Sequence, residues 1–444
     1  MDTPGTELEP TPVLGEFDLV RLPEQSNTPP PSNLPPLWRN RDYMLLWSGQ
    51  VISVIGTGAT QIVYPLLILA LTNSAAAAGV AAALGSIPYI LFSLPAGALV
   101  DRWDRKRVMI YCDIGRAAVL ATIPLAMWFD ALTIWQIYAC ALLEGSLFVF
   151  FNIAEVAALP RVVEKPQLPQ AVAQNDVAFS IANILAPTLG AAMFQLGKAI
   201  PFVFDVVSYL VSVVSLLFIR KEFQSERLTH GASQETETHI VREIREGLSW
   251  LWHQHLIRYM ALLTGALNFV NAPITLIIIV LAKNLGASDA DIGLVFSISA
   301  IGAIVGAIIG GNIQKKFRFG QVIVTTVWIT ALLFPLLAFA PTFWFLALIM
   351  GLSWMTGPVY NVVQFSYRVA LIPDELQGRV NSVFRLLAFG FQPAGAAIAG
   401  VLIERFNVYV AIAFFTAWYF AWAIATMLNR NIRNARQIGQ AGAG

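Results

Sequence analysis

The sequence predicts an all-α membrane protein in which twelve transmembrane helices form two pseudo-symmetric bundles of six. Three observations support this prediction. Of the 444 residues, 57% are hydrophobic and 12% are charged, and the mean hydropathy is +0.65. The segment from Tyr43 to Val100 contains no Asp, Glu, Lys, Arg or His, and it is long enough for about two bilayer crossings at ~20 residues each. A single long polar interruption, near residues 220–250, separates six apolar segments from six more.

Residues 1–40 contain nine prolines, several acids and only two basic residues, Arg21 and Arg39. This composition is typical of a disordered tail and lacks the basic start and apolar centre of a secretory signal peptide. Apolar segments between charged or turn-forming residues then predict the twelve spans. They lie near residues 44–71, 75–100, 108–128, 132–159, 170–197, 199–219, 256–282, 290–313, 320–340, 342–371, 378–404 and 407–428.

The predicted organisation is a proline-rich tail over 1–40, a first bundle over 41–219, a linker over 220–255, a second bundle over 256–428 and a tail over 429–444. In and just after the linker, charged and aromatic residues alternate at helical spacing in VREIREGLSWLWHQHLIRYM. This pattern predicts an amphipathic helix on the membrane surface rather than a nucleic-acid-binding segment.

The distribution of basic residues predicts the orientation. If the termini share one side, the tails and loops on that side hold 22 of the 28 Lys and Arg residues, whereas the opposite side holds only Lys198, Lys283 and Arg405. Because loops rich in Lys and Arg stay in the cytoplasm, we expect a multi-pass plasma-membrane protein with both termini cytoplasmic.

The two halves show a weak internal repeat. Pro160 follows span 4 as Pro373 follows span 10, and twelve residues separate Asn175 from Pro187 and Asn381 from Pro393 alike. Two related bundles about an axis along the membrane normal favour a ligand site between them, near the middle of the membrane.

The segment GALVDRWDRKR at 97–107 places six charges directly after the long uncharged segment, which predicts a short loop between spans 2 and 3. It resembles the loop signature of the major facilitator superfamily. Three further features resemble its drug, macrolide and siderophore exporters: Asp113 with Arg116 in span 3, PFVFDVVSYL at 201–210, and IPDELQGRVNSVFRLLAFGFQPAG at 372–395. The resemblance covers roughly 41–430 and implies a monomeric transporter of small molecules without cofactor or metal. The signature residues are Gly97, Asp101, Arg102, Arg105, Lys106 and Arg107.

The resemblance also implies a cytoplasmic gate, which includes Asp113 and Arg116 besides the signature residues. A helix N-terminus presents free N–H groups and partial positive charge, so Asp101 is expected to dock near Gly378 and Arg379, at the start of span 11, when the cytoplasmic side closes. The alternative is that the signature charges only fix topology. Glu155 and Arg368 each lie five residues before the aligned prolines, and they could bridge the halves at the same gate. Alternatively, each pairs within its own half.

Glu144 lies close to mid-membrane in span 4, where a carboxylate is costly unless it is protonated or faces a wet cavity. It shares one helical face with Phe148, Phe151, Asn152 and Glu155. This stripe predicts a proton-coupling site beside an aromatic pocket. The alternative is a buried neutral acid that is hydrogen-bonded to a neighbouring span. Asp205 lies nearer a span end, where we expect a structural role.

Polar and aromatic side chains in the spans that line the cavity of the resembled fold are candidates for substrate contact, although the polar ones often only form hydrogen bonds between helices. These candidates are Gln61, Tyr64, Phe148, Asn152, Asn268, Asn271, Asn361 and Gln364.

The sequence gives little support for an enzyme. It contains no GxxxxGK[ST] string, and no acid or cysteine cluster accompanies His253 and His255, which argues against an ATP-driven pump and a metal site. We therefore expect secondary active export of small amphipathic or hydrophobic compounds, drug-like or siderophore-like, by proton antiport with alternating access. Two alternatives stay open. These are a transporter for uptake, uniport or lipids without proton coupling, and a nontransporting membrane scaffold or receptor.

Overall fold

The computed structural model describes residues 35–221, 223, 237–373, 376–433 and 435. Within these residues every regular element is a helix, and twelve segments are long and apolar enough to cross a membrane, which confirms the predicted fold class. A short 3-10 turn, η1 (Leu37–Arg39), precedes the first half, and η2 (Lys165–Gln167) lies within it. The helices of the first half are α1 (Arg41–Thr72), α2 (Ala75–Arg102), α3 (Arg105–Trp128), α4 (Ile134–Val162), α5 (Leu168–Leu196) and α6 (Ile200–Phe218).

The second half follows α7 (Glu237–His253) and contains three interrupted spans. Pro273 separates the two helices of the seventh span, Pro335 lies in a 3-10 turn at the end of the ninth, and Phe391 separates the helices of the eleventh. Proline cannot donate the helical hydrogen bond, which explains the first two breaks. The elements are α8 (His255–Asn271), α9 (Ile274–Asn284), α10 (Asp289–Lys316), α11 (Phe319–Leu333), η3 (Phe334–Phe339), α12 (Phe343–Leu371), α13 (Gln377–Gly390), α14 (Gln392–Arg405), α15 (Val408–Leu428) and α16 (Arg430–Arg433).

The charged segment 97–107 is not the loop that we expected. Its charges divide between the last turn of α2 and the first turn of α3, with only Trp103 and Asp104 between the helices. The Asp104 carboxylate accepts a hydrogen bond from the Arg107 backbone N–H at 2.9 Å. This N-cap explains why α3 begins at Arg105, earlier than expected.

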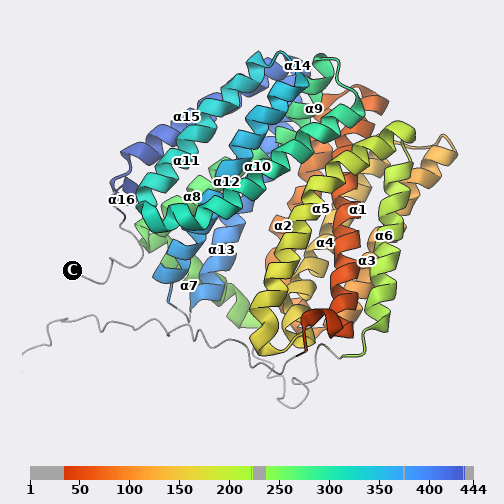
Figure 1. Cartoon of the computed structure of the whole chain (residues 1–444), viewed down its shortest axis with the longest axis horizontal. Coiled ribbons are helices and arrows are strands. Elements are labelled where there is room, and N and C mark those ends of the chain that lie inside the picture. Colours follow the sequence, from red (N-terminus) through yellow and green to blue (C-terminus); the bar gives the residue numbers. More distant parts are fainter. Residues whose placement is uncertain (1–34, 222, 224–236, 374–375, 434, 436–444) are drawn as a thin grey trace, which may run out of the picture.

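We call the end of the molecule that holds the α2–α3 turn the loop end, and the end that holds the α1–α2 turn the far end. In Figure 1 the helices of the two halves converge near α9 and α14 and diverge toward α7. The halves pack together through α2 against α14 and α5 against α10. At the far end, Glu404 accepts hydrogen bonds from the Ser74 hydroxyl and from the Ala76 N–H, the latter at 2.8 Å. The Ser297 hydroxyl on α10 donates to the Ile184 carbonyl on α5. The far end is therefore hydrogen-bonded closed.

Small residues allow α10 and α12 to approach closely. Gly302, Gly306 and Gly310 are each four residues apart in α10, so they lie on one face of this helix. A Cβ added at Gly306 would lie 2.1 Å from the Met355 carbonyl oxygen, and one added at Gly302 would lie 2.0 Å from the Gly351 oxygen. Backbones this close exclude any larger residue, so these glycines fix the distance between the two helices.

Candidate functional site

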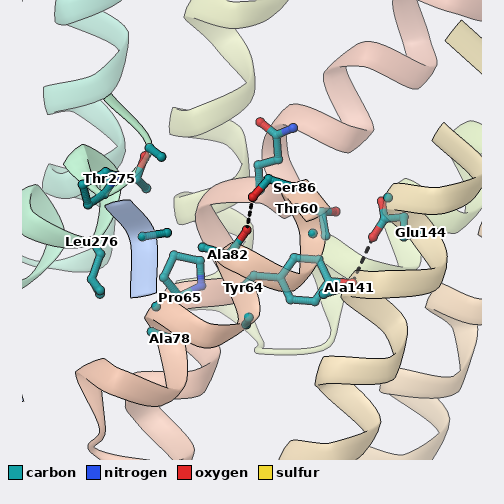
Figure 2. A pocket seen from close by; sticks show the side chains of 18 of the residues that line it. Thr60, Tyr64, Pro65, Ala78, Ala82, Ser86, Ala141, Glu144, Thr275 and Leu276 are labelled. Atoms are coloured by element: carbon teal, nitrogen blue, oxygen red, sulfur yellow. Dashed lines mark hydrogen bonds between the residues drawn. The ribbon is translucent and has the colours of Figure 1, made fainter. Parts of the chain in front are cut away.

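A central cavity of about 350 Å³ lies between the two halves. Its walls come from α1, α2, α3 and α4 of the first half, from the segment around Pro273, and from Ala396 on α14. Figure 2 shows Glu144 and Thr275, which belong to different halves, on opposite sides of this cavity. Most of the wall is apolar and includes Pro65 and Leu276. The cavity is therefore an apolar chamber with a carboxyl group in its wall.

Glu144 lies near the middle of its helix. Helix α4 has 29 residues and begins at Ile134, so at a rise of 1.5 Å per residue Glu144 is about 15 Å along it. Its Oε2 accepts a hydrogen bond from the Tyr64 hydroxyl of α1 at 3.0 Å, and its Oε1 accepts one from the Tyr209 hydroxyl of α6 at 2.9 Å. Both oxygens of this carboxyl group therefore accept hydrogen bonds from tyrosine hydroxyls on neighbouring helices.

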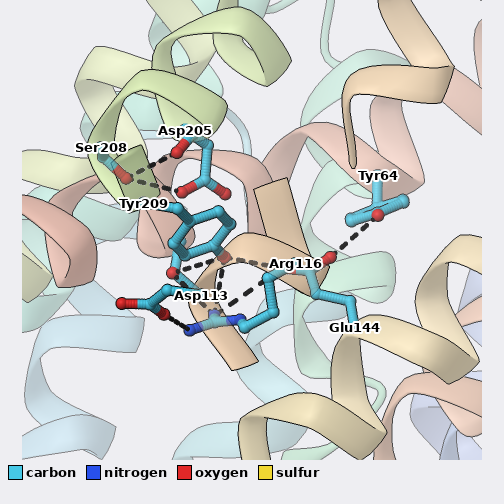
Figure 3. A network of polar contacts seen from close by, with 8 residues as sticks. Tyr64, Asp113, Arg116, Glu144, Asp205, Ser208 and Tyr209 are labelled. Carbon is cyan, nitrogen blue, oxygen red and sulfur yellow. Dashed lines mark hydrogen bonds and ion pairs between the residues drawn. The ribbon is translucent and has the colours of Figure 1, made fainter. Parts of the chain in front are cut away.

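Arg116 is the cation of this group, as Figure 3 shows. Its Nη2 lies 3.9 Å from Glu144 Oε1 and donates to the Tyr209 hydroxyl at 2.6 Å, and its Nη1 lies 3.6 Å from Asp113 Oδ1. The guanidinium also lies 5.4 Å from the ring centre of Phe148. Arg116 is 2% exposed. The structure therefore brings Asp113 and Arg116 together with Glu144, and Arg116 also lines the cavity that contains the predicted gate residue Glu155.

Asp205 is the third acid of the group and is fully buried. Its Oδ1 accepts a hydrogen bond from Ser208 at 3.0 Å, whereas its Oδ2 has no hydrogen-bond partner within the described part of the chain. We call Asp113, Arg116, Glu144 and Asp205 the acid cluster. Three carboxyl groups surround one guanidinium, so the cluster is neutral only when two of the carboxyl groups hold protons.

A second cavity, of about 560 Å³, extends from the acid cluster toward the loop end, and we call it the loop-side cavity. Glu155 and Asn152 line it together with residues of α1 and α5. Gln61, Arg116 and Phe148 line this cavity and the central cavity alike. The predicted stripe on α4 therefore does face cavities, with Arg116 and Phe148 between them.

The signature residues have mostly structural contacts in this conformation. Arg105 donates to the Ala157 carbonyl of α4 at 3.0 Å, and Lys106 donates to the Ile219 carbonyl after α6 at 2.7 Å. Cations near helix C-termini satisfy free carbonyl groups and stabilise the helix dipole. Arg102 and Arg107 are exposed, and a Cβ at Gly97 would meet no atom within 4 Å.

Of the two gate contacts expected at the loop end, the ion pair between Glu155 and Arg368 is not formed here. Arg379 pairs instead with Glu246 of α7 at 2.7 Å. Arg368 lies 4.1 Å from the ring centre of Phe384, and the residues that the structure describes include no ion pair between Arg368 and Glu155. The side chain of Asp101 and the surroundings of Gly378 lie outside what the structure describes. Both gate contacts stay predictions for a conformation closed at the loop end.

The remaining substrate candidates divide between cavities. Gln61 and Tyr64 line the central cavity, whereas Asn268, Asn271 and Asn361 line a separate cavity in the second half. Gln364 is 4% exposed and does not line these cavities.

Three members of the polar network were not predicted as site residues. The Thr57 hydroxyl lies 3.0 Å from the Tyr209 hydroxyl and accepts from Arg116 at 3.1 Å. Asp205, assigned a structural role from its place near a span end, lies beside this network (Figure 3). The spacing of Asp205 and Tyr209, four residues apart on α6, puts both on one helical face and was the available signal.

The comparison with known families agrees with this arrangement. A family described as transmembrane secretion effectors matches residues 31–441, which include all twelve spans. The chain belongs to this family, within the major facilitator superfamily. Its members are transporters rather than enzymes, so we interpret the cavities as parts of a transport path.

Two proteins similar to this chain are named as efflux proteins. Macrolide efflux protein A of Streptococcus pyogenes is 25% identical over 379 residues, which cover 84% of this chain and 91% of that protein. The multidrug efflux pump Tap of Mycolicibacterium fortuitum is 26% identical over 360 residues, which cover 79% and 86%.

Solved structures show the same fold at low identity. The nucleoside transporter NupG has a TM-score of 0.71 at 13% identity, over 87% of this chain and 98% of that one. A bacterial homologue of the iron transporter ferroportin has a TM-score of 0.69 at 14% identity, over 88% and 100%.

Proposed function

We propose that this protein exports small amphipathic or hydrophobic compounds across the plasma membrane in exchange for protons, by alternating access of a central site. The observation that supports this most is the acid cluster. Glu144 lies in the wall of a cavity between the halves, hydrogen-bonded to two tyrosines and close to a single guanidinium. An acid at this depth is expensive unless it serves proton or substrate movement.

The orientation follows from the basic residues, which place the loop end and both termini in the cytoplasm. The loop-side cavity then faces the cytoplasm, and the hydrogen bonds of Glu404 and Ser297 close the outer side. In the proposed cycle Glu144 releases its proton to the cytoplasm in this conformation, before the substrate binds.

The exchange needs only a change of charge at Glu144. When the outer side opens, a proton neutralises the carboxylate, and its attraction for Arg116 and for a bound cationic or polar group is lost. At 3.9 Å this attraction is about 4 kcal/mol at an effective dielectric constant of ~20. The substrate then leaves outward. Glu144 ionises again once the inner side opens.

The gate residues complete the cycle. When the loop end closes, Asp101 docks on the N-terminus of α13, and Glu155 reaches Arg368 across the entrance. Glu155 and Arg368 support this step because neither has an ion pair within the described residues of the present conformation. Their bridge must break in every cycle, so its net contribution should be modest, about 0–1 kcal/mol in a wet entrance.

Efflux from proteoliposomes tests the proposal. The probes are macrolides and lipophilic fluorescent dyes, because similar proteins are named for macrolide and multidrug efflux. We expect efflux that depends on an imposed proton gradient in the parent and is abolished in Glu144→Gln. Glu164→Gln, which changes an exposed acid at the loop end, is the control and should behave as the parent. Gradient-independent efflux that survives Glu144→Gln would refute proton antiport and favour a transporter without proton coupling.

A further inference from the structure

The second half contains a cavity of about 320 Å³ at the position that the acid cluster occupies in the first half, and we call it the second-half cavity. Its walls come mainly from α8, α11 and α12, and Tyr419 of α15 also contributes. These are the first, third, fourth and sixth spans of the second half, as α1, α3, α4 and α6 are of the first. The two sites are therefore related by the pseudo-symmetry of the fold.

The chemistry of the two sites differs. None of the residues that line the second-half cavity carries a full charge. The hydroxyl groups of Thr330 and Thr356 lie 2.9 Å apart, where the first half has charged side chains on the corresponding helices α3 and α4. Another hydroxyl pair, Thr264 with Tyr360 at 2.8 Å, joins α8 to α12. More than half of the lining residues carry an uncharged hydroxyl or amide group.

Two amide side chains in this wall are available to a ligand. Asn271 on α8 and Asn361 on α12 line the cavity and are exposed. Each amide offers two donors and one acceptor oxygen. Trp354 and Phe334 add aromatic surface to the same wall. The cavity thus combines donors, acceptors and flat apolar faces, with no counter-charge for an ion.

The second-half cavity lies next to a third cavity, of about 370 Å³, between the halves. Trp354 and Ala303 line both. The third cavity shares the wall residues Gln61 and Thr275 with the central cavity. Three neighbouring cavities therefore lie in a row from Glu144 to Asn361, separated by side chains that they share.

We propose that the second-half cavity binds a neutral group rich in hydroxyls, such as a sugar or another polyol, belonging to the exported compound; this assignment rests on the proposed function. A charged group would lose its hydration here without gaining a counter-charge. A hydrocarbon would displace water from the amide groups of Asn271 and Asn361 and leave them unpaired, whereas the threonine hydroxyls are already bonded within the protein. A group whose hydroxyls both donate and accept satisfies the two amides.

Binding to the purified protein in lipid nanodiscs tests this assignment. The probes are a coumarin glucoside and the corresponding coumarin methyl ether, which are both neutral and differ in the sugar. We expect the parent to bind the glucoside more tightly. Asn361→Leu and, separately, Asn271→Leu should weaken glucoside binding by about 5- to 150-fold and leave methyl ether binding unchanged. Ser299→Ala is the control, because its buried hydroxyl donates to Val295 within α10 and does not line the cavity.

The outcomes separate this inference from the proposed function. Equal binding of the two probes, no binding of the glucoside, or a glucoside preference that survives both Leu variants at unchanged melting temperature would overturn the inference. Proton-driven dye efflux, lost in Glu144→Gln, would still support the proposed function in each of these cases. Conversely, a glucoside preference that needs Asn361, found without gradient-dependent efflux, would keep the binding site and refute proton antiport.

Discussion

Replacing Asp205 with Asn should leave proton-driven efflux intact, although Asp205 belongs to the acid cluster. Asp205 is fully buried. Within the described residues its carboxyl group accepts a hydrogen bond from Ser208, and the Thr60 hydroxyl interacts with it as well. Ionising a carboxyl group in such a place costs several kcal/mol, whereas one hydroxyl donor to a charge returns about 1.5–3 kcal/mol. The neutral acid is therefore favoured, and Asn has the shape of the neutral acid.

The charge of the cluster then depends on one residue. With Asp205 neutral and Asp113 balanced by Arg116, only Glu144 changes its charge in the proposed exchange, which then moves one proton in each cycle. We expect Asp205→Asn to change the unfolding free energy by less than about 1 kcal/mol and the efflux rate by less than about threefold. Glu144→Gln should abolish the response to the gradient.

The assay is dye efflux from proteoliposomes at a series of imposed pH differences, with melting temperatures measured on the same preparations. Asp205→Ala is the structural control: it removes the Ser208 contact and should destabilise the protein by about 1–3 kcal/mol while the remaining efflux stays gradient-dependent. If Asp205→Asn melts as the parent does yet loses gradient-driven efflux, Asp205 exchanges a proton and the one-proton reasoning is wrong.

Three further predictions concern packing and gating. Gly306→Ala should destabilise the protein by several kcal/mol in thermal unfolding, because its Cβ would lie 2.1 Å from a backbone oxygen, whereas Gly311→Ala in the same helix meets no atom within 4 Å and should be neutral; equal effects would contradict the packing argument. Glu155→Arg and Arg368→Glu should each lower efflux severalfold and the double variant should restore it, a result that pairing within each half would not give. Glu404→Gln should weaken the outer contacts by about 1 kcal/mol and raise, about fivefold, the labelling from outside of a cysteine introduced in the central cavity; unchanged labelling would count against Glu404 as an outer latch.

Much of the fold was predictable because a bilayer restricts the chain to a few solutions. Backbone N–H and C=O groups in lipid must form hydrogen bonds within their own segment, and a helix does this. A long uncharged segment therefore predicts a transmembrane helix. The boundaries were less predictable where capping decides them. The Asp104 cap moved the start of α3 into the charged segment, and the side chain-to-backbone bond that does this has no hydropathy signal.

The candidate site was predictable only in part. Glu144 was evident because a lone acid in an apolar span has a cost that the sequence displays. The grouping of Arg116, Tyr209 and Thr57 around it was not evident, because these residues come from three helices far apart in sequence. A helical face can be read from one segment, but the face that it meets depends on packing between segments.

The interrupted spans of the second half affect how readily the cavities can change shape compared with the acid cluster. Helices α9 and α14, which follow the breaks near Pro273 and Phe391, belong to the second half, whereas α1 and α5 of the first half run unbroken past Pro65 and Pro187. A broken helix bends at lower cost than a continuous one. Bending of the second half can therefore reshape the cavities without altering the distances among the acids and Arg116. Substitutions in the second half can thus change which compounds the cavities accept, while the acid cluster in the first half keeps its arrangement.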